Sequence, residues 1–181
     1  MTETAKIGVI GGSGLYEMKN ISDVTEVRVE TPFGAPSDAL ILGTIKGVRC
    51  AFLPRHGRGH TITPSELNGR ANIWALKSLG VERIVSIGAV GSLKESISPR
   101  HFVFPDQLID ETKGRTSTFF GEGVVGHVAF AQPFCEAMSG LLFDTAERLG
   151  ITCHRGGVYC CMEGPQFSPK AARAMPRTLG Y

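Results

Sequence analysis

The chain has 181 residues, of which 42% are hydrophobic and 20% are charged. These are the values of a globular protein that can bury a sizeable core, so a disordered chain is excluded. The net charge of +2 and the scattered basic residues give no stripe for nucleic acid, and no apolar run is long enough to cross a membrane.

The first part of the chain alternates apolar runs with turn residues. Residues 6–10 predict a buried first strand that runs into the glycine turn 11–14. Residues 24–30 alternate valine with polar residues and predict a half-exposed strand. The apolar runs 39–42 and 48–53, joined by a short turn segment, predict a hairpin.

A helix and a further strand are predicted next. Ser65 can cap a helix that reaches Leu79, because the apolar positions between them recur at helical spacing, and Gly80 ends it. Residues 83–87 predict a strand that leads into a run of small residues at 88–92.

The second half is richer in loops. Residues 111–126 form a long polar loop, and residues 134–149 predict an amphipathic helix between Pro133 and Gly150. Ser168, followed by a proline, predicts the cap of a last helix. Short apolar pieces lie at residues 102–104, 108–109 and 157–162.

Strands and helices are therefore interspersed, which predicts an α/β fold with a mixed central sheet flanked by helices. No repeat or linker interrupts the sequence, so we expect a single domain over residues 1–181. The polar N-terminus carries no secretion signal, and we expect a cytoplasmic protein, with a nuclear location left open.

The segment 55–60 (RHGRGH) carries the strongest functional signal. It gathers two arginines and two histidines in six residues, directly after a predicted strand. Arginine presents a planar fork that suits phosphate oxygens, so the segment predicts an oxyanion site, with a solvated basic loop as the alternative. His56 and His60 have the spacing of a metal pair, but the intervening glycines disfavour a helix, and we predict no metal site.

Two other glycine-rich strand ends are expected at the same edge of the sheet, since sites in such folds gather at the carboxyl ends of strands. Residues 11–14 can form a nest of backbone N–H groups with the Ser13 hydroxyl beside it, or simply a tight turn. Glu17 replaces the third glycine of a dinucleotide fingerprint, which disfavours an oxidoreductase. Residues 88–92 would let a flat ligand approach the backbone, and Phe167 could stack on a base or fill the core.

Taken together, the segments resemble the 5′-methylthioadenosine phosphorylase branch of the trimeric purine nucleoside phosphorylase family. The resemblance covers nearly the whole chain in family order. The segments that carry it are residues 7–15 (IGVIGGSGL), 31–43 (TPFGAPSDALILG), 55–77 (RHGRGHTITPSELNGRANIWALK), 89–93 (AVGSL), 106–110 (DQLID), 132–135 (QPFC) and 162–168 (MEGPQFS).

The resemblance implies phosphorolysis of S-methyl-5′-thioadenosine to adenine and 5-methylthioribose 1-phosphate, in a homotrimer, with phosphate as co-substrate and without a cofactor. The family pattern places phosphate at Ser13, Arg55, His56, Gly88 and Ala89. It places the nucleoside at Val90, Gly91 and Phe167, and at His127 reaching a neighbouring subunit. Ser168 falls where the family's base preference is influenced.

The chain departs from the family pattern in two respects. Gly88 stands where relatives carry a hydroxyl residue, which removes a donor to phosphate. The resemblance also implies further strands and helices beyond Tyr181, including the base-reading aspartates, so no catalytic residue is assigned and the fold is expected to be incomplete at the C-terminus. We expect little or no activity from the 181-residue form. A phosphorylase for 6-oxopurine nucleosides and a non-catalytic interaction fragment are the alternatives.

Overall fold

The computed structural model describes residues 4–12 and 20–180. The chain divides into two compact units, which are described separately below. Unit 1 comprises residues 1–89 and 115–121, and unit 2 comprises residues 90–114 and 122–181.

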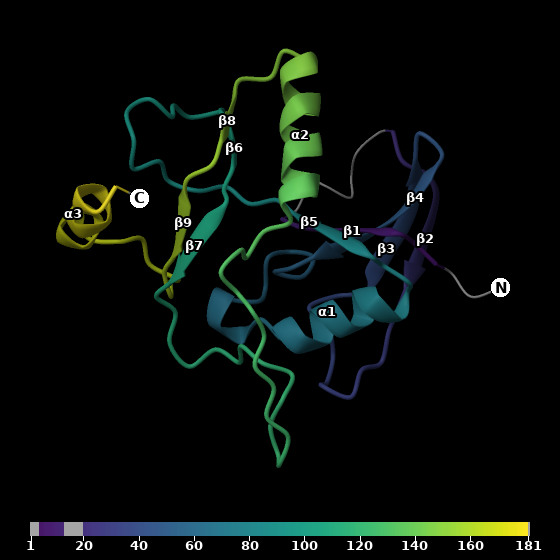
Figure 1. The fold of residues 1–181 in the computed structure, drawn as a ribbon. Coiled ribbons are helices and arrows are strands. Elements are labelled where there is room, and N and C mark those ends of the chain that lie inside the picture. The colour runs from purple at the N-terminus through teal and green to yellow at the C-terminus, as the bar shows by residue number, and fades with distance from the viewer. Residues whose placement is uncertain (1–3, 13–19, 181) are drawn as a thin grey trace. The chain divides into compact units, whose positions relative to one another are not determined.

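Unit 1 is built on a five-stranded sheet with the strand order β2-β3-β4-β1-β5 (Figure 1). β2, β3 and β4 pair antiparallel, whereas β4, β1 and β5 pair parallel. This confirms the mixed sheet of an α/β fold. The strands are β1 (Ile7–Gly11), β2 (Ser22–Val27), β3 (Leu40–Ile45), β4 (Val48–Pro54) and β5 (Arg83–Ser86).

The predicted hairpin is confirmed, since β3 and β4 pair antiparallel across a turn at Lys46 and Gly47. The predicted bounds of the preceding strand are wrong. β2 begins two residues before Val24 and ends at Val27, because Val27 is paired with Leu40, the first residue of β3.

The predicted helix start at Ser65 is also wrong. Residues 64–66 form a separate short 3₁₀ turn, η1 (Pro64–Glu66), in which the Glu66 carboxylate accepts hydrogen bonds from the backbone N–H and the hydroxyl of Thr63. The helix α1 (Gly69–Ser78) begins later, where the Asn68 side chain accepts a hydrogen bond from the Ala71 N–H at 3.1 Å. An asparagine is as good an N-cap as the serine that the sequence favoured.

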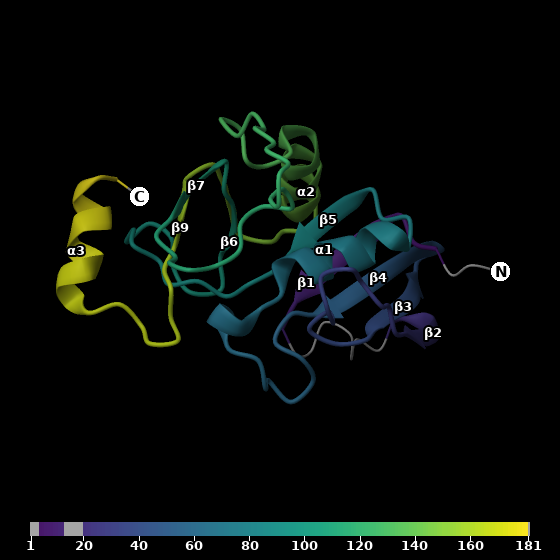
Figure 2. The same cartoon turned by 90° about the horizontal axis from the view of Figure 1, so that it is seen from below.

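Both faces of the sheet contribute to the core of unit 1. α1 lies against one face (Figure 2), where Ala75 and Leu76 of the helix, with Leu79 just after it, cluster with apolar side chains of β3 and β4. A second cluster on β3 and β4 contains Ile41, Cys50 and Phe52. The strands that carry the candidate site are therefore held by buried side chains rather than by loops.

Unit 2 contains two separate two-stranded parallel sheets and two helices. β6 (Phe102–Phe104) pairs with β8 (Cys153–Arg155), and β7 (Gln107–Asp110) pairs with β9 (Val158–Cys161). The helix predicted at 134–149 is confirmed as α2 (Glu136–Arg148).

The last helix is α3 (Lys170–Thr178), and Pro169 occupies its N-cap position. The prediction that Ser168 caps this helix is wrong. Its hydroxyl instead lies 2.8 Å from the Met162 sulfur.

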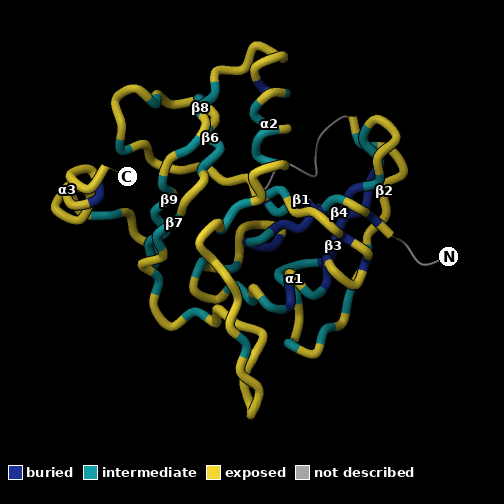
Figure 3. The backbone as a smooth tube through the Cα atoms, viewed as in Figure 1, coloured by how far each residue is buried: buried dark blue, intermediate teal, exposed yellow. Residues whose placement is uncertain are grey.

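Few residues of unit 2 are buried (Figure 3). Among the described residues of this unit, Ala146 and Pro176 alone are buried. None of the helices in the described part of the chain is long and apolar enough to cross a membrane.

Candidate anion-binding site

The carboxyl ends of β4, β1 and β5 lie at one edge of the sheet. The parallel register pairs Gly11 with Pro54 and Ile10 with Ser86, so the three strands end side by side. The Arg55 N–H donates to the Gly11 carbonyl at 3.1 Å, which fixes the start of the basic loop to the end of β1. Ser13, predicted to join this site, lies outside the described residues.

Arg55 links the ends of β4 and β5. Its Nη1 donates a hydrogen bond to the Ile87 carbonyl at 2.8 Å, across the end of β1. A Cβ atom built on Gly88 would lie 3.6 Å from Nη2 of Arg55, so the guanidinium lies directly beside Gly88. In the part of the chain that the structure describes, no carboxylate pairs with Arg55. Within the described residues its guanidinium donates to the Ile87 carbonyl and to the His56 ring.

His56 is buried and both of its ring nitrogens are engaged. Nε2 accepts a hydrogen bond from Nε of Arg55 at 3.1 Å, so the hydrogen is assigned to Nδ1, which donates to the Ile62 carbonyl at 2.8 Å. The ring stacks on His60 with centroids 4.5 Å apart. In this tautomer His56 orients the Arg55 guanidinium and is itself held by the loop.

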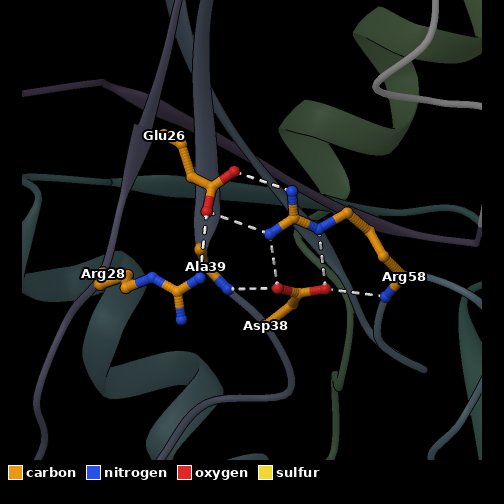
Figure 4. Close-up of polar contacts among 5 residues, drawn as sticks. All are labelled: Glu26, Arg28, Asp38, Ala39 and Arg58. Atoms are coloured by element: carbon orange, nitrogen blue, oxygen red, sulfur yellow. Dashed lines mark hydrogen bonds and ion pairs between the residues drawn. The ribbon is translucent and has the colours of Figure 1, made fainter.

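Arg58 has a different role from Arg55, although both belong to the same loop. Its side chain donates to the Asp38 carboxylate from Nε at 3.2 Å and from Nη2 at 3.0 Å (Figure 4). Nη1 and Nη2 also donate to the Glu26 carboxylate, at 2.7 and 3.1 Å. Hydrogen bonds from the Arg58 side chain lower the pKa of both carboxyl groups. Arg58 is thus neutralised by two carboxylates and fastens the loop to β2 and to residue 38.

The segment that carries Asp38 is held by two asparagines at the start of α1. Asn68 donates to the Phe33 carbonyl at 2.7 Å. Asn72, which is buried, accepts from the Ser37 N–H at 2.8 Å and donates to the Ser37 hydroxyl at 2.9 Å. The helix therefore positions the carboxylate that in turn positions the basic loop.

The structure brings Arg55, His56 and Gly88 together, and Ala89 follows directly. The residues predicted to bind the nucleoside are all exposed. Phe167 is 94% exposed, Val90 is 60% exposed, and His127 is exposed in the long loop. Two hollows of ≈ 370 and ≈ 590 Å³ occur in unit 2 between residues 92–99 and α3, and neither is lined by these side chains.

Sequence reasoning missed Glu26, Asp38 and Asn72 as parts of the site. Glu26 is 32 residues from Arg58 and Asp38 is 20 residues away, so no local spacing connects them. The one available signal was the excess of cations in the loop, which requires either an anion or nearby carboxylates. Among the described residues, no group of three or more His, Cys, Asp or Glu side chains could hold a metal ion.

Comparison with known sequences shows which proteins this chain resembles. The sequence model of the phosphorylase superfamily matches residues 6–181. A protein of Koribacter versatilis named S-methyl-5′-thioadenosine phosphorylase is 57% identical over 177 residues, which cover 98% of this chain and 61% of the relative. A protein of the same name from Geobacter sulfurreducens is 57% identical over 175 residues, covering 96% and 61%.

Solved structures agree with this result. A methylthioadenosine phosphorylase from an antarctic soil metagenomic library has a TM-score of 0.95 and 49% identity, covering 98% of this chain and 63% of that one. A methylthioadenosine phosphorylase of Schistosoma mansoni in complex with adenine has a TM-score of 0.90 and 37% identity, covering 98% and 72%. The chain spans about three fifths of the length of the curated relatives named above.

Proposed function

Because this chain belongs to the phosphorylase superfamily, we propose that it is the phosphate-binding part of an S-methyl-5′-thioadenosine phosphorylase. The reaction would be a pentosyl transfer in which phosphate attacks C1′ of the thioribose and displaces adenine, giving 5-methylthioribose 1-phosphate. The curated relatives, at 57% identity, carry this name, which supports this substrate over 6-oxopurine nucleosides.

One observation carries the proposal: the two arginines of the basic loop differ in their partners among the described residues. Arg58 is bound by two carboxylates, whereas the Arg55 guanidinium lies at the carboxyl edge with no carboxylate partner in the described chain. A cation fixed there can hold phosphate for attack and stabilise the oxyanion. The negative phosphate beneath the sugar would in turn stabilise the positive charge that develops on the ribose ring.

The remaining site residues keep their proposed roles. Ser13, His56, Gly88 and Ala89 would complete the phosphate site. Val90, Gly91, Phe167 and His127 would line the nucleoside site, and Ser168 would influence the choice of base. Phosphate is a co-substrate, so the proposed reaction requires no cofactor. A homotrimer in the cytoplasm, in which His127 reaches a neighbouring subunit, belongs to the same proposal.

We expect the 181-residue chain on its own to bind phosphate without appreciable turnover. The candidate phosphate residues Arg55, His56 and Gly88 lie just after strands of the packed sheet, whereas Phe167 and Val90 are largely exposed. Adenine release from S-methyl-5′-thioadenosine and phosphate, followed by absorbance, should therefore be very slow.

The decisive experiment is a phosphate titration of the wild type and of Arg55→Met by calorimetry. Loss of a charged hydrogen-bond donor should raise the phosphate Kd about tenfold or more. Arg49→Met is the matched control, because it removes the same charge near the amino end of β4, and its Kd should equal that of the wild type. An unchanged Kd in Arg55→Met would refute the proposed site.

A gain-of-binding variant sharpens the same test. Gly88 has room for a side chain, since a Cβ there would meet nothing closer than 3.6 Å. Gly88→Ser would place a hydroxyl beside the Arg55 guanidinium. One added hydrogen bond should tighten phosphate binding by about 1 kcal/mol, or about fivefold.

A further inference from the structure

The hollow between residues 92–99 and α3 in unit 2 has a strongly basic lining. Its two parts, of ≈ 370 and ≈ 590 Å³, share Ser92, Leu93 and Arg177, so they adjoin one another. Among the described residues that line it, one is a carboxylate, Glu95, and four are cations: Lys94, Lys170, Arg173 and Arg177. These five charged residues define the basic hollow.

α3 presents three of these cations along one face. Lys170, Arg173 and Arg177 are spaced by three and by four residues, so their side chains follow one another along the helix. The sequence of α3 contains no acidic residue that could pair with them at this spacing. Because like charges at helical spacing repel one another, an anion placed across this face would relieve the repulsion.

The opposite wall of the basic hollow is held by hydrogen bonds of its own. The Ser92 hydroxyl donates to the Lys94 carbonyl at 2.8 Å and accepts from the Lys94 N–H at 3.2 Å. Further along, the Ser98 N–H donates to Nδ1 of His101 at 3.3 Å, and the same nitrogen lies 2.9 Å from Nε2 of His154 in β8. The backbone that carries Lys94 is therefore held in a defined turn.

The carboxylate in the basic hollow balances little of this charge. Oε1 of Glu95 lies 4.0 Å from Nη2 of Arg177, at the limit of an ion pair, and the Glu95 side chain is 97% exposed. Ion pairs between exposed side chains are weak in water. Among the described residues, Lys170 and Arg173 form no ion pair with a carboxylate. Arg58 in unit 1, in contrast, is bound by two carboxylates.

The residue types and their spacing indicate the class of anion. Arginine presents a planar fork of donors that suits phosphate oxygens, and lysine adds a point charge. From residue 170 to residue 177 a helix rises about 10 Å, so a chain of phosphates can contact all three cations of α3, whereas one phosphate group cannot. Among the described residues, the lining includes no aromatic side chain on which a nucleobase could stack.

We propose that the basic hollow binds a linear oligophosphate, an anion of three or more linked phosphate groups. The chain of phosphates would lie along α3 against Lys170, Arg173 and Arg177, with Lys94 on the opposite wall. A volume of ≈ 590 Å³ is within the range of small-molecule sites. The site is independent of the proposed phosphorolysis, because none of its residues is among those assigned above to phosphate or to the nucleoside.

The test is a calorimetric titration of the 181-residue chain with inorganic tripolyphosphate, which should bind with a Kd of about 1 mM or less. Arg173→Met should raise this Kd about tenfold, because a charged hydrogen-bond donor is lost. Arg148→Met is the matched control. The Arg148 side chain donates to the Asp144 carbonyl and the Thr145 hydroxyl in α2, so this variant should keep the wild-type Kd.

Crossing variants with ligands separates this site from the one proposed at Arg55. Tripolyphosphate should still bind to the Arg55→Met variant, and Arg173→Met should leave the Kd for orthophosphate unchanged. Loss of orthophosphate binding in Arg55→Met would therefore say nothing against the basic hollow, and failure of tripolyphosphate to bind would say nothing against the site at Arg55.

Glu95→Gln tests the same site in the opposite direction. It removes the carboxylate that lines the basic hollow, so tripolyphosphate should bind about two- to fivefold more tightly. Because the Glu95 side chain is 97% exposed, this variant should fold like the wild type. It keeps the proposal testable if a substitution in α3 were to disturb the helix.

Three results would overturn the proposal. One is the absence of binding at about 10 mM tripolyphosphate. Another is a Kd that neither Arg173→Met nor Glu95→Gln changes. The third is binding of ATP, of a single-stranded oligonucleotide or of a glutamate-rich peptide about tenfold more tightly than tripolyphosphate, since this would assign the basic hollow to a nucleotide, a nucleic acid or an acidic protein segment.

Discussion

Unit 1 and unit 2 differ sharply in how much of each is packed. Unit 1 holds two clusters of buried apolar side chains on the two faces of its sheet, whereas the buried residues described in unit 2 are Ala146 and Pro176 (Figure 3). The candidate phosphate residues Arg55, His56 and Gly88 belong to unit 1. The candidate phosphate residues therefore stand on a packed framework, whereas the residues proposed for the nucleoside belong to a unit with little core of its own.

The largest expected effect comes from removing a core side chain of unit 1. Phe52→Ala should lower the free energy of unfolding by about 3–5 kcal/mol, because Phe52 is 2% exposed and its loss leaves a cavity. The measurement is urea unfolding followed by the fluorescence of Trp74, the single tryptophan, which lies in α1 of unit 1.

Leu141→Ala in α2 is the matched substitution in unit 2. Leu141 is 62% exposed, so its removal should change stability by no more than about 0.5 kcal/mol. Hydrogen exchange of the α2 amides would report the response of unit 2 itself. Equal losses in the two variants would show that unit 2 is as well packed as unit 1 and would break the comparison.

The same contrast explains which parts of the fold could be predicted from the sequence. Apolar runs and turn residues predicted β1, the β3–β4 hairpin and α2, because these features depend on local pattern. The helical spacing of residues 134–149 also predicted an amphipathic helix, and it could not show that Leu141 stays 62% exposed while Ala146 is buried. Burial depends on what packs against a helix, which periodicity does not contain.

In the candidate site too, the features that depend on local sequence could be predicted and those that depend on distant residues could not. The position of Arg55 and His56 at the end of β4 could be predicted, since a loop after a strand is a local feature. The separate roles of Arg55 and Arg58 could not, because the carboxylates that distinguish them come from distant segments. Asn68 and Ser65 are similar as helix caps, and the hydrogen bond from Asn68 to the distant Phe33 carbonyl is a tertiary contact that the local sequence does not contain.

A smaller effect is expected from the buried polar contact that joins α1 to residue 37. Asn72→Ala would leave the Ser37 N–H without its acceptor, and it should lower stability by about 1–3 kcal/mol in the Trp74 transition. Because Ser37 precedes Asp38, this variant should also weaken phosphate binding through the loop that Arg58 holds.

Thr145→Ala provides the counterpart in unit 2. The Thr145 hydroxyl bonds to the Leu141 carbonyl within α2 itself, so its loss should stay within about 0.5 kcal/mol. If Thr145→Ala lowered the free energy of unfolding as much as Asn72→Ala does, the polar contact within one helix would stabilise the protein as much as the long-range one.

The smallest expected effect is a pH dependence of stability that arises from Arg58 and its two carboxylate partners, Glu26 and Asp38. Hydrogen bonding by Arg58 lowers the pKa of Asp38 and of Glu26 below their ordinary values of 3.8 and 4.5. The folded carboxylates therefore hold their protons less tightly than the unfolded ones. The stabilisation is fully present above the ordinary values and is lost as the pH falls through the lower folded values.

Arg58→Met removes the cause of both shifts, so its stability should fall less steeply than that of the wild type as the pH drops from about 5 to about 3. Urea unfolding followed by Trp74 fluorescence at several pH values measures the two slopes. Arg148→Met is the control of equal charge, since the Arg148 side chain donates to the Asp144 carbonyl and the Thr145 hydroxyl rather than to Asp38 or Glu26, and it should keep the wild-type slope. If Arg58→Met and the wild type had the same slope, the cluster would contribute nothing to holding the loop, and the rigidity of the phosphate site would have to come from the apolar core alone.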